Sequence, residues 1–332
     1  MSLYERVARA VETADVLINA GALNLHPDFL AQLPVITVLS FNDDPEASAA
    51  SRPVAAHHDL CMIGNIAEVA TYKSWGVRHV EWWPIGFRAD DFDPTMTDEG
   101  IVGRERDVDV ALLCERITSY RRAKVDRFAL AFPQGAYYGR GWPNGFLSEA
   151  KRIPLLQRTK IGINIHNSTG PINFRTYYLP ANGVLQICDN KRYLAGIYDL
   201  GSEAVGYDTI DEAIDLCRYY LVHDAERRER ALAGWKRALK EYNEVAVFNR
   251  LIAAVERLGM GAKRRIDVVP SLRVHEHETR RRRLAHASVA PILRPMQRLT
   301  RLLVGGARRA SGWLDNARYR RQARQLLKRS SS

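Results

Sequence analysis

The chain has 332 residues, enough for two domains with separate cores, because a single core rarely grows far beyond about 250 to 300 residues. Apolar residues make up 46% of the sequence and charged residues 26%, which excludes a disordered or fibrous protein. The net charge of +11 does not by itself indicate nucleic-acid binding, because residues 263–332 hold 19 Lys and Arg against 4 Asp and Glu, whereas the remainder carries a net charge of −4.

The N-terminal segment predicts a helix over residues 3–11 and lacks the basic start, apolar run and small-residue cleavage site of a signal peptide. No stretch reaches the 18 apolar residues of a membrane span. The four cysteines are far apart and form no C-x-x-C pair, which argues against a zinc site or a disulfide framework. We therefore expect a cytoplasmic protein.

Short runs of β-branched and aromatic residues alternate with segments of helical periodicity, a pattern typical of parallel sheets covered by helices on both faces. Strands are predicted at residues 14–19, 35–40, 60–63, 79–83, 108–113, 135–138, 160–165, 183–188 and 203–207. After the last strand, Thr209 and Glu212 form a capping box at the start of an amphipathic helix. The fold class is therefore α/β.

Residues 86–107 interrupt this rhythm with Gly, Pro, Asp and Glu and are predicted to link two lobes. We place an N-terminal Rossmann-like lobe at 1–105 and a C-terminal Rossmann-like lobe at 106–262. Helices at 226–241 and 243–258 are expected to close the second lobe, and a basic tail occupies 263–332.

The first candidate motif, Tyr-Gly-Arg-Gly-Trp, lies at residues 138–142, directly after a predicted strand. Gly139 and Gly141 allow the backbone to turn sharply, and the Arg140 guanidinium can bind phosphate oxygens with two donors. A tight turn with a solvent-facing arginine explains the same residues equally well.

The second motif is an apolar strand that ends in a polar loop at residues 164–170. In parallel α/β sheets, ligands bind beyond the carboxyl ends of the strands. The loop then places polar side chains at the edge of a pocket: Asn164, His166, Asn167, Ser168 and Thr169. A hydrogen-bonded structural histidine is the alternative for His166, and the residue type alone favours it.

The third motif is Asn-Phe-Arg-Thr-Tyr-Tyr-Leu-Pro-Ala-Asn-Gly at residues 173–183. The start of a helix here offers free N–H groups to a diphosphate, and Arg175 adds a full positive charge. Asn182 and Gly183 are expected to end the helix, a role that a simple helix–turn–strand connection also explains. We expect Arg175→Ala to weaken nucleotide binding and to leave the fold intact.

These motifs, in this order, resemble the CgeB-like (spore-maturation-type) glycosyltransferases. The resemblance also includes Asn-Asp-Asp-Pro at residues 42–45, Tyr-Lys-Ser-Trp-Gly-Val at 72–77, Trp-Pro-Ile-Gly at 83–86 and Ala-Gly-Ile-Tyr-Asp-Leu-Gly-Ser-Glu-Ala-Val-Gly-Tyr at 195–207, and it covers residues 35–258. It implies a GT-B fold, in which two Rossmann-like lobes face each other across a cleft and the C-terminal lobe holds a nucleotide-diphospho-sugar.

The resemblance also implies transfer of the sugar to a glycan or glycolipid hydroxyl without a catalytic metal or other cofactor. Helix dipoles and basic side chains neutralise the diphosphate leaving group in such enzymes. Residues at matching positions are expected to form the donor site: Gly139, Arg140, Gly141, Asn164, His166, Arg175, Tyr178, Asn182, Gly183 and Glu203. Arg140 and Arg175 would face the phosphates, and Glu203 would lie at the edge of the pocket.

The chain departs from the family pattern in two places. Tyr178 stands where family members commonly have the glutamate that holds the donor ribose, and a tyrosine cannot accept two hydrogen bonds from a diol in the same way. The sequence also begins at a helix, without the first strand and glycine turn of the N-terminal lobe. Either this lobe is reduced or the true start lies upstream.

The base that would activate the acceptor is less evident. Asp43 and Asp44 follow a predicted strand and are the candidates, although Asp-Asp-Pro also commonly opens a helix or turn. His57 and His58 are nearby in the sequence, but a solvated loop explains this pair better than catalysis does.

The tail contains four consecutive arginines at residues 280–283, and Ile292, Met296, Leu299 and Leu303 then recur at helical spacing. A basic amphipathic helix of this kind suits an anionic membrane surface, so residues 280–329 would make the protein peripheral at the inner face of the cell membrane. A solvated basic tail is an equal alternative. Nucleic acid is the least favoured partner, because no recognised binding module accompanies the charge.

The sequence therefore predicts a cytoplasmic glycosyltransferase that acts on lipid-linked or envelope glycans. The main alternative is a catalytically weakened relative that binds a nucleotide or glycan, which the tyrosine at position 178 favours. A nucleic-acid-associated protein is a minor alternative that rests on the arginines of the tail.

Overall fold

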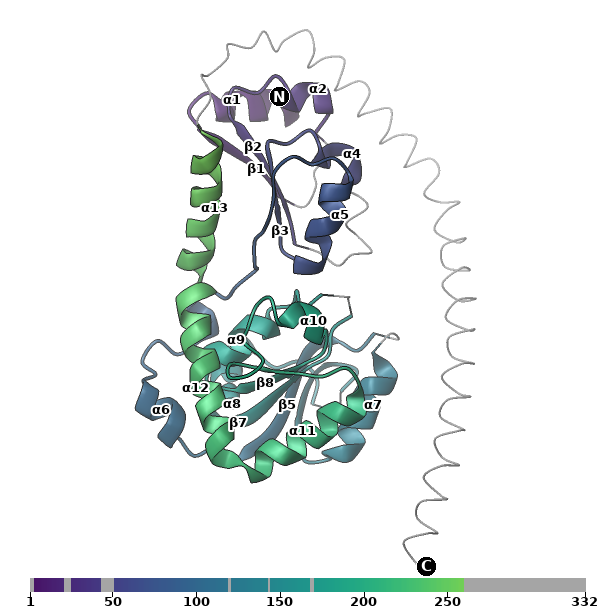
Figure 1. Ribbon diagram of the computed structural model, residues 1–332, viewed down its shortest axis with the longest axis vertical. Coiled ribbons are helices and arrows are strands. Elements are labelled where there is room, and N and C mark those ends of the chain that lie inside the picture. The colour runs from purple at the N-terminus through teal and green to yellow at the C-terminus, as the bar shows by residue number, and fades with distance from the viewer. Residues whose placement is uncertain are drawn as a thin grey trace, which may run out of the picture. The chain divides into compact units, whose positions relative to one another are not determined.

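The computed structural model describes residues 3–20, 25–42, 51–118, 121–142, 144–167 and 170–259. The chain forms two parallel sheets, the first from strands within residues 16–82 and the second from strands within residues 108–206 (Figure 1). Each predicted strand overlaps an observed one, so the prediction of an α/β fold with two parallel sheets is confirmed. The tail predicted to dock on membranes lies outside the described residues.

The N-terminal sheet has the order β1-β2-β3-β4, in which each strand pairs in parallel with the next. Its strands are β1 (Val16–Ala20), β2 (Ile36–Phe41), β3 (Leu60–Ile63) and β4 (Val80–Trp82). The connecting helices are α1 (Leu3–Val11), α2 (Pro27–Leu30), α4 (Arg52–Ala55), η1 (Ile66–Glu68) and α5 (Val69–Ser74). On one face of this sheet, Leu39, Phe41, Cys61 and Ile63 pack against Tyr72 of α5.

Helix α13 (Glu244–Leu258) covers the other face of the N-terminal sheet. Its buried residues Val247, Leu251 and Ala254 pack against residues of β2 and β3, including Val38 and Met62. The indole of Trp83 donates a hydrogen bond of 2.8 Å to the carbonyl of Val247. The expectation that this helix closes the second lobe is therefore wrong, because its apolar stripe fits the open face of the first sheet.

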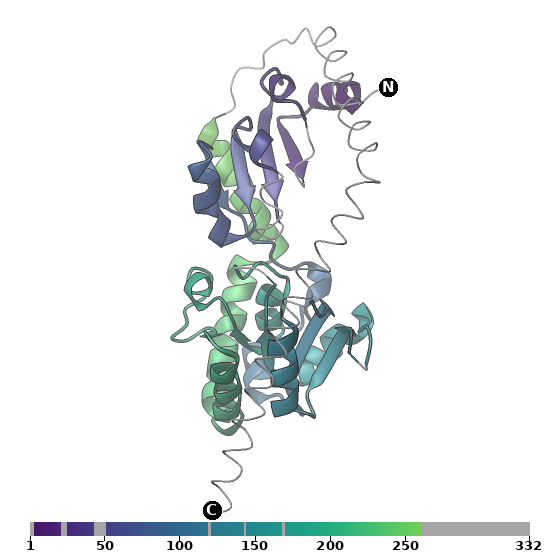
Figure 2. The ribbon, with the colours of Figure 1, turned by 90° about the vertical axis from the view of Figure 1, so that its right-hand side faces the viewer.

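The C-terminal sheet has the order β6-β5-β7-β8-β9 and is also parallel. Its strands are β5 (Val108–Arg116), β6 (Ala136–Arg140), β7 (Thr159–Asn164), β8 (Leu185–Cys188) and β9 (Val205–Gly206). Its helices are α7 (Arg122–Ala131), α8 (Glu149–Arg158), α9 (Arg175–Ala181), α10 (Lys191–Leu194), α11 (Ile210–Val222) and α12 (Asp224–Glu241). Buried residues of α7 and α11 belong to one core cluster, and those of α8, α9 and α10 belong to another, so both faces of the sheet are covered (Figure 2).

The predicted linker at residues 86–107 is more ordered than its composition indicates. It contains η2 (Ala89–Asp91) and α6 (Asp98–Gly103). Ile101 of α6 is buried against Trp235 of α12, and the buried Arg106 guanidinium donates to backbone carbonyls of Leu156, Thr159 and Asn182. This segment therefore packs on the C-terminal lobe and can contribute side chains to a site there.

The four cysteines are free thiols and are buried. Within the part of the chain that the structure describes, no helix combines the length and the apolar character needed to cross a bilayer.

Candidate functional site

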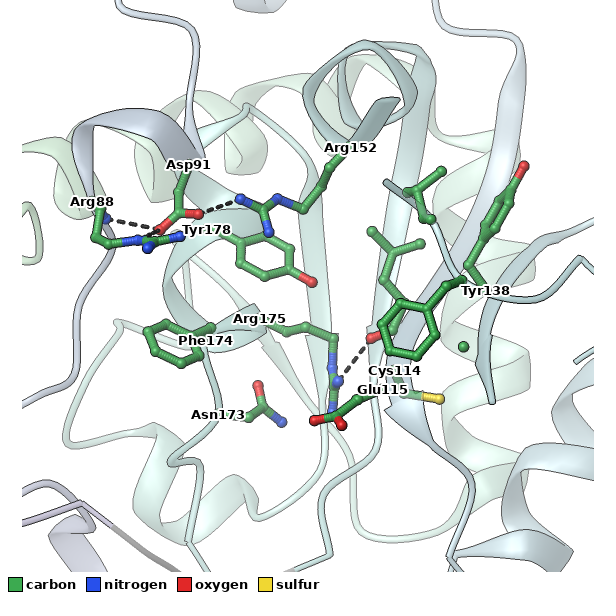
Figure 3. Close-up of a pocket in the computed structure, with 14 residues that line it drawn as sticks. Arg88, Asp91, Cys114, Glu115, Tyr138, Arg152, Asn173, Phe174, Arg175 and Tyr178 are labelled. Atoms are coloured by element: carbon green, nitrogen blue, oxygen red, sulfur yellow. Dashed lines mark hydrogen bonds and ion pairs between the residues drawn. The ribbon is translucent and has the colours of Figure 1, made fainter. Parts of the chain in front are cut away.

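A cavity of about 410 Å³ opens at the carboxyl ends of β5 and β6, where ligands bind in parallel α/β sheets. Helix α9, the end of α8 that carries Arg152 and the segment around η2 complete its wall (Figure 3). The lining residues are Arg88, Asp91, Leu113, Cys114, Glu115, Tyr138, Gly139, Phe146, Leu147, Arg152, Asn173, Phe174, Arg175 and Tyr178. Gly139, Arg175 and Tyr178 are thus brought together, as the sequence predicts for a shared site.

Arg175 supplies a buried positive charge at this cavity. Its guanidinium donates to the carbonyl oxygen of Leu113 at 2.7 Å, to Oδ1 of Asn164 at 3.0 Å and to the carbonyl of Ile165 at 3.4 Å. All three acceptors are neutral, and Arg175 has no carboxylate partner among the described residues. A buried cation that is held by neutral oxygens favours the approach of an anion.

A second charged group lines the cavity beside Tyr178. Asp91 accepts hydrogen bonds from the side chain of Arg152 and from the backbone N–H of Arg88, the latter at 2.9 Å, and the Arg88 Nε lies 3.4 Å from the same carboxylate. The Arg152 guanidinium carbon lies 5.5 Å from the centre of the Tyr178 ring. Two guanidinium groups thus share one buried carboxylate, which leaves a positive excess.

The glycines of the first motif shape the end of β6. Gly139 has a φ of +136°, and a Cβ atom there would overlap the carbonyl oxygen of Cys114, so only glycine fits. The register of β5 and β6 shifts between Leu113 and Arg116, which is the irregularity that this close approach requires. Arg140 is exposed, lies over the Phe146 ring and is not part of the cavity wall. Gly141 has a φ of +96° and forms the turn beyond it.

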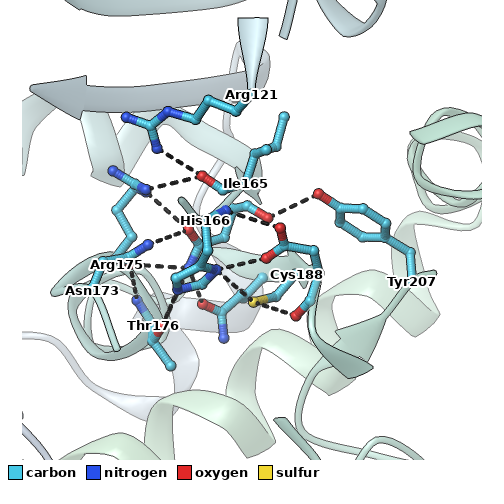
Figure 4. Close-up of polar contacts among 11 residues, drawn as sticks. Arg121, Ile165, His166, Asn173, Arg175, Thr176, Cys188 and Tyr207 are labelled. Atoms are coloured by element: carbon cyan, nitrogen blue, oxygen red, sulfur yellow. Dashed lines mark hydrogen bonds and ion pairs between the residues drawn. The ribbon is translucent and has the colours of Figure 1, made fainter. Parts of the chain in front are cut away.

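Asn164 and His166 belong to a buried polar network behind the cavity (Figure 4). Nδ1 of His166 lies 2.6 Å from Oδ1 of Asp189, and its Nε2 lies 3.3 Å from the Thr176 hydroxyl. Asn164 bonds to Asn173, to Thr176 and to Arg175. Both ring nitrogens of His166 are therefore engaged, and the structural alternative given above for this histidine fits its position.

The start of α9 is partly capped by its own chain. The N–H of Thr176 donates to the Asn173 side chain at 3.2 Å, so this amide is not free for a diphosphate. Asn173 itself lines the cavity. The positive charge of the site therefore comes chiefly from the guanidinium groups.

His166, Cys188 and Asp189 form a group that could hold a metal ion among the described residues. However, burial raises the pKa of the Cys188 thiol well above its ordinary value, which disfavours the thiolate that a metal requires. The imidazole and carboxylate already satisfy each other by a hydrogen bond. His166 and Asp189 are therefore better explained as a structural hydrogen-bonded pair, with Cys188 as a buried neighbour.

Besides Arg140, Gly141, Asn164 and His166, three further predicted donor-site residues do not line the cavity. Asn182 is buried and its amide donates to the carbonyls of Asp91 and Tyr178, and Gly183 takes a φ of +65° just before β8. Glu203 accepts a hydrogen bond from the N–H of Asp199 in a turn before β9. All three precede strands, whereas the cavity lies at the strands' carboxyl ends, so these residues are not part of its lining.

Other predicted residues fall outside the described part of the chain or outside the site. Asp43, Asp44, Ser168 and Thr169 lie outside the described residues, so their roles stay predictions. Asn167 accepts a hydrogen bond from Thr118 at 2.6 Å. His57 is exposed, and His58 is buried between Asn19 and Val54.

Sequence reasoning missed several residues of the wall: Arg88, Asp91, Glu115, Phe146, Arg152 and Phe174. Arg88 and Asp91 lie in the segment interpreted as a linker, and their spacing of three residues is a local signal of helix capping. Arg152 lies 61 positions after Asp91, so no sequence pattern reveals that pair. Glu115 directly follows the apolar run of β5, and this position was the available clue.

Comparison with known proteins agrees with this architecture. Residues 113–253 match a protein family model described as glycosyl transferase-like. No curated protein sequence matches the chain. Among solved structures, sucrose-phosphate synthase from Thermosynechococcus elongatus superposes with a TM-score of 0.55 and 12% identity, covering 77% of this chain and 79% of that one. The chain has a GT-B fold.

Two further structures show the same GT-B likeness. HepE of Anabaena, in complex with UDP-glucose, has a TM-score of 0.55 and 12% identity over 77% of this chain and 82% of that one. A glycosyltransferase from Rickettsia africae has a TM-score of 0.55 and 12% identity over 77% of this chain and 80% of that one. This likeness, at 12% identity, establishes the fold.

Proposed function

We propose that the chain is a glycosyltransferase that holds a nucleotide-diphospho-sugar in the cavity and transfers the sugar to a glycan or glycolipid hydroxyl. The observation that carries this proposal is the buried Arg175 guanidinium, which lines the cavity and is held only by neutral oxygens. The family match over residues 113–253 and the UDP-glucose bound by the structurally similar HepE support it.

The proposed chemistry places the developing negative charge of the leaving diphosphate beside Arg175. A preorganised cation in a water-poor site stabilises such charge without reorganising solvent during the reaction. Because protein side chains supply this charge, we propose that transfer needs no metal ion. Asp43 and Asp44 stay the proposed candidates for activating the acceptor hydroxyl.

A binding module that no longer catalyses transfer is the second candidate. The observation that favours it is Tyr178, which lines the cavity where the resemblance implies a ribose-binding glutamate. Such a module would bind nucleotide or glycan and would show no turnover.

Thermal unfolding with UDP, GDP, CDP and dTDP and their sugars tests the proposal. One nucleotide should raise the melting temperature by several degrees at 100 times its Kd, because binding then adds about 2.7 kcal/mol of stability. Sugar transfer or hydrolysis in the same mixture, also with EDTA present, distinguishes a metal-independent enzyme from a module. If no nucleotide or nucleotide sugar raised the melting temperature and none were turned over, this result would contradict both candidates.

We also propose that the enzyme is cytoplasmic and docks on the inner face of the cell membrane through residues 280–329. Membrane docking would bring the cavity to lipid-linked or envelope glycans. The charge and apolar spacing of the tail support this proposal.

A further inference from the structure

Tyr178 presents an unused hydroxyl to the cavity. The residue is only 8% exposed, yet its hydroxyl has no hydrogen-bond partner among the described residues. Figure 3 shows the hydroxyl directed into the cavity between Arg152 and Arg175. The hydroxyl is not among the fully buried side-chain atoms without a partner, so it is accessible from the cavity and can donate a hydrogen bond to a ligand atom there.

The groups around Tyr178 are also hydrogen-bond donors. The Arg152 guanidinium lies against the Tyr178 ring, and its Nε is buried without a hydrogen-bond partner. The Arg175 guanidinium is on the other side and has no carboxylate partner among the described residues. An arginine side chain cannot accept hydrogen bonds, so this wall offers donors to a ligand.

The nearby carboxylate of Asp91 is not available as an acceptor. Arg152 donates to one of its oxygens, and the backbone and side chain of Arg88 donate to the other. Asp91 is also only 2% exposed. The cavity wall therefore carries three guanidinium groups, of Arg88, Arg152 and Arg175, against two carboxylates, of Asp91 and Glu115, and the carboxylate nearest Tyr178 is the occupied one of Asp91.

We propose that Tyr178, Arg152 and Arg175 form a phosphate-binding wall, so that this part of the cavity binds the phosphate groups of the ligand and not its ribose hydroxyls. The inference rests on the proposed function in assigning those phosphates to a nucleotide sugar. Burial raises the pKa of the Tyr178 phenol, which keeps its proton in place for donation at neutral pH.

A phosphate-binding wall also affects which donor nucleotides the cavity accepts. A site that binds the ribose diol through a carboxylate discriminates against a 2′-deoxyribose, because a polar partner is then left unpaired. A wall that binds phosphate does not make this distinction. The cavity should therefore accept ribo- and deoxyribonucleoside diphosphates with similar affinity.

Calorimetric binding of inorganic pyrophosphate, UDP and 2′-deoxy-UDP to the full chain tests the proposal, with Tyr178→Phe as the variant. This change removes only the unpartnered hydroxyl, so the fold should be unaffected. Tyr138→Phe is the matched control, because Tyr138 lines the same cavity but directs its hydroxyl away from it in Figure 3. A second variant, Tyr178→Glu, restores the carboxylate that the resemblance implies.

We expect Tyr178→Phe to weaken binding of both pyrophosphate and UDP about tenfold, and Tyr138→Phe to leave both within about twofold. The wild type should bind UDP and 2′-deoxy-UDP within about twofold, and Tyr178→Glu should bind pyrophosphate more weakly still. Unchanged affinities in Tyr178→Phe, or tighter UDP binding in Tyr178→Glu, would overturn the proposal.

The outcomes also separate this inference from the proposed function. Pyrophosphate binding that depends on Tyr178, without binding of any nucleotide sugar, would keep the phosphate wall and reject the transferase. If Tyr178→Phe left nucleotide-sugar turnover and binding unchanged, this result would keep the transferase and reject the phosphate wall. Failure of all three probes to bind would reject both.

Discussion

At the scale of single residues, Arg175 has two roles that the sequence does not separate. As a cavity residue it offers positive charge, and as a buried residue it joins the end of β5 to β7 through the carbonyls of Leu113 and Ile165. The same side chain also positions Asn164, which organises the polar network around His166. Its removal must therefore affect both the ligand site and the framework that supports it.

The structure changes the expected result of Arg175→Ala. The sequence alone predicts an intact fold, but the alanine would remove the Arg175 bond to the buried Leu113 carbonyl and one of two side-chain donors to Ile165 and to Asn164, and we expect a loss of about 1–3 kcal/mol in the free energy of unfolding. Urea denaturation measures this loss. Arg140→Ala is the control, since Arg140 is exposed, and it should change stability by less than about 0.5 kcal/mol. Equal urea midpoints for both variants would show that the Arg175 bonds are not structural.

At the scale of elements, the N-terminal sheet is held together by contacts that link strands to distant helices. The His58 ring, just after α4, connects Asn19 of β1 at 3.1 Å to the carbonyl of Val54 in α4 at 2.9 Å. The carbonyl can only accept a proton, so Nδ1 carries the hydrogen and Nε2 accepts from the amide. This arrangement uses the neutral imidazole.

Stability of this region should consequently depend on the charge of His58. Burial lowers the pKa of His58 below its ordinary value, so between the folded and unfolded pKa values the unfolded chain binds more protons. The contribution of neutral His58 to the free energy of unfolding is fully present above about pH 6.5. It is lost as the pH falls through the lowered pKa, by at most about 1.4 kcal/mol per pH unit. Urea denaturation at pH values from 7.5 down to 5 measures this effect. The difference in the free energy of unfolding between the wild type and His58→Gln should become smaller as the pH falls.

His57→Gln is the matched control for this experiment, because His57 is exposed. Its unfolding free energy should follow that of the wild type across the same range. If the difference in unfolding free energy between the wild type and His58→Gln instead stayed constant across this pH range, protonation of His58 would not be coupled to folding.

At the scale of the whole molecule, the sequence predicts what depends on local pattern. The strands were predictable because short runs such as Leu-Cys-Met-Ile at residues 60–63 and the isoleucines at 161, 163 and 165 have the apolar or alternating pattern of buried strands. The sheet on which α13 packs was not predictable, because an apolar stripe indicates that a helix is buried but not against which sheet it packs.

The candidate site follows the same division. Gly139 and Arg175 were predicted from local motifs and Tyr178 from the family resemblance, whereas the pair of Arg152 with Asp91 depends on the tertiary fold. Asn182 and Gly183 do not line the cavity, which the sequence could not reveal because a motif does not indicate at which end of the sheet its loop lies. Their loop precedes β8, opposite to the strand ends that form the cavity.

The charge of the chain is divided at the same scale, and this division tests the proposed membrane docking. Deletion of residues 263–332 removes a net charge of +15 and leaves the described cores complete. We expect the shortened protein to keep its melting temperature and to lose cosedimentation with anionic vesicles, since each basic residue near such a surface contributes about 1 kcal/mol. Neutral vesicles provide the control for charge.

A second variant separates electrostatic attraction from insertion of an apolar helix face. Leu299→Ser with Leu303→Ser keeps every arginine but removes half of the apolar series Ile292, Met296, Leu299 and Leu303. If the tail enters the headgroup boundary, this variant should bind anionic vesicles more weakly at 0.5 M salt, where screening leaves mainly the apolar contribution. Binding that vanishes equally in both proteins at this salt concentration would indicate a purely electrostatic tail, and binding retained after the deletion would place the membrane contact elsewhere in the chain.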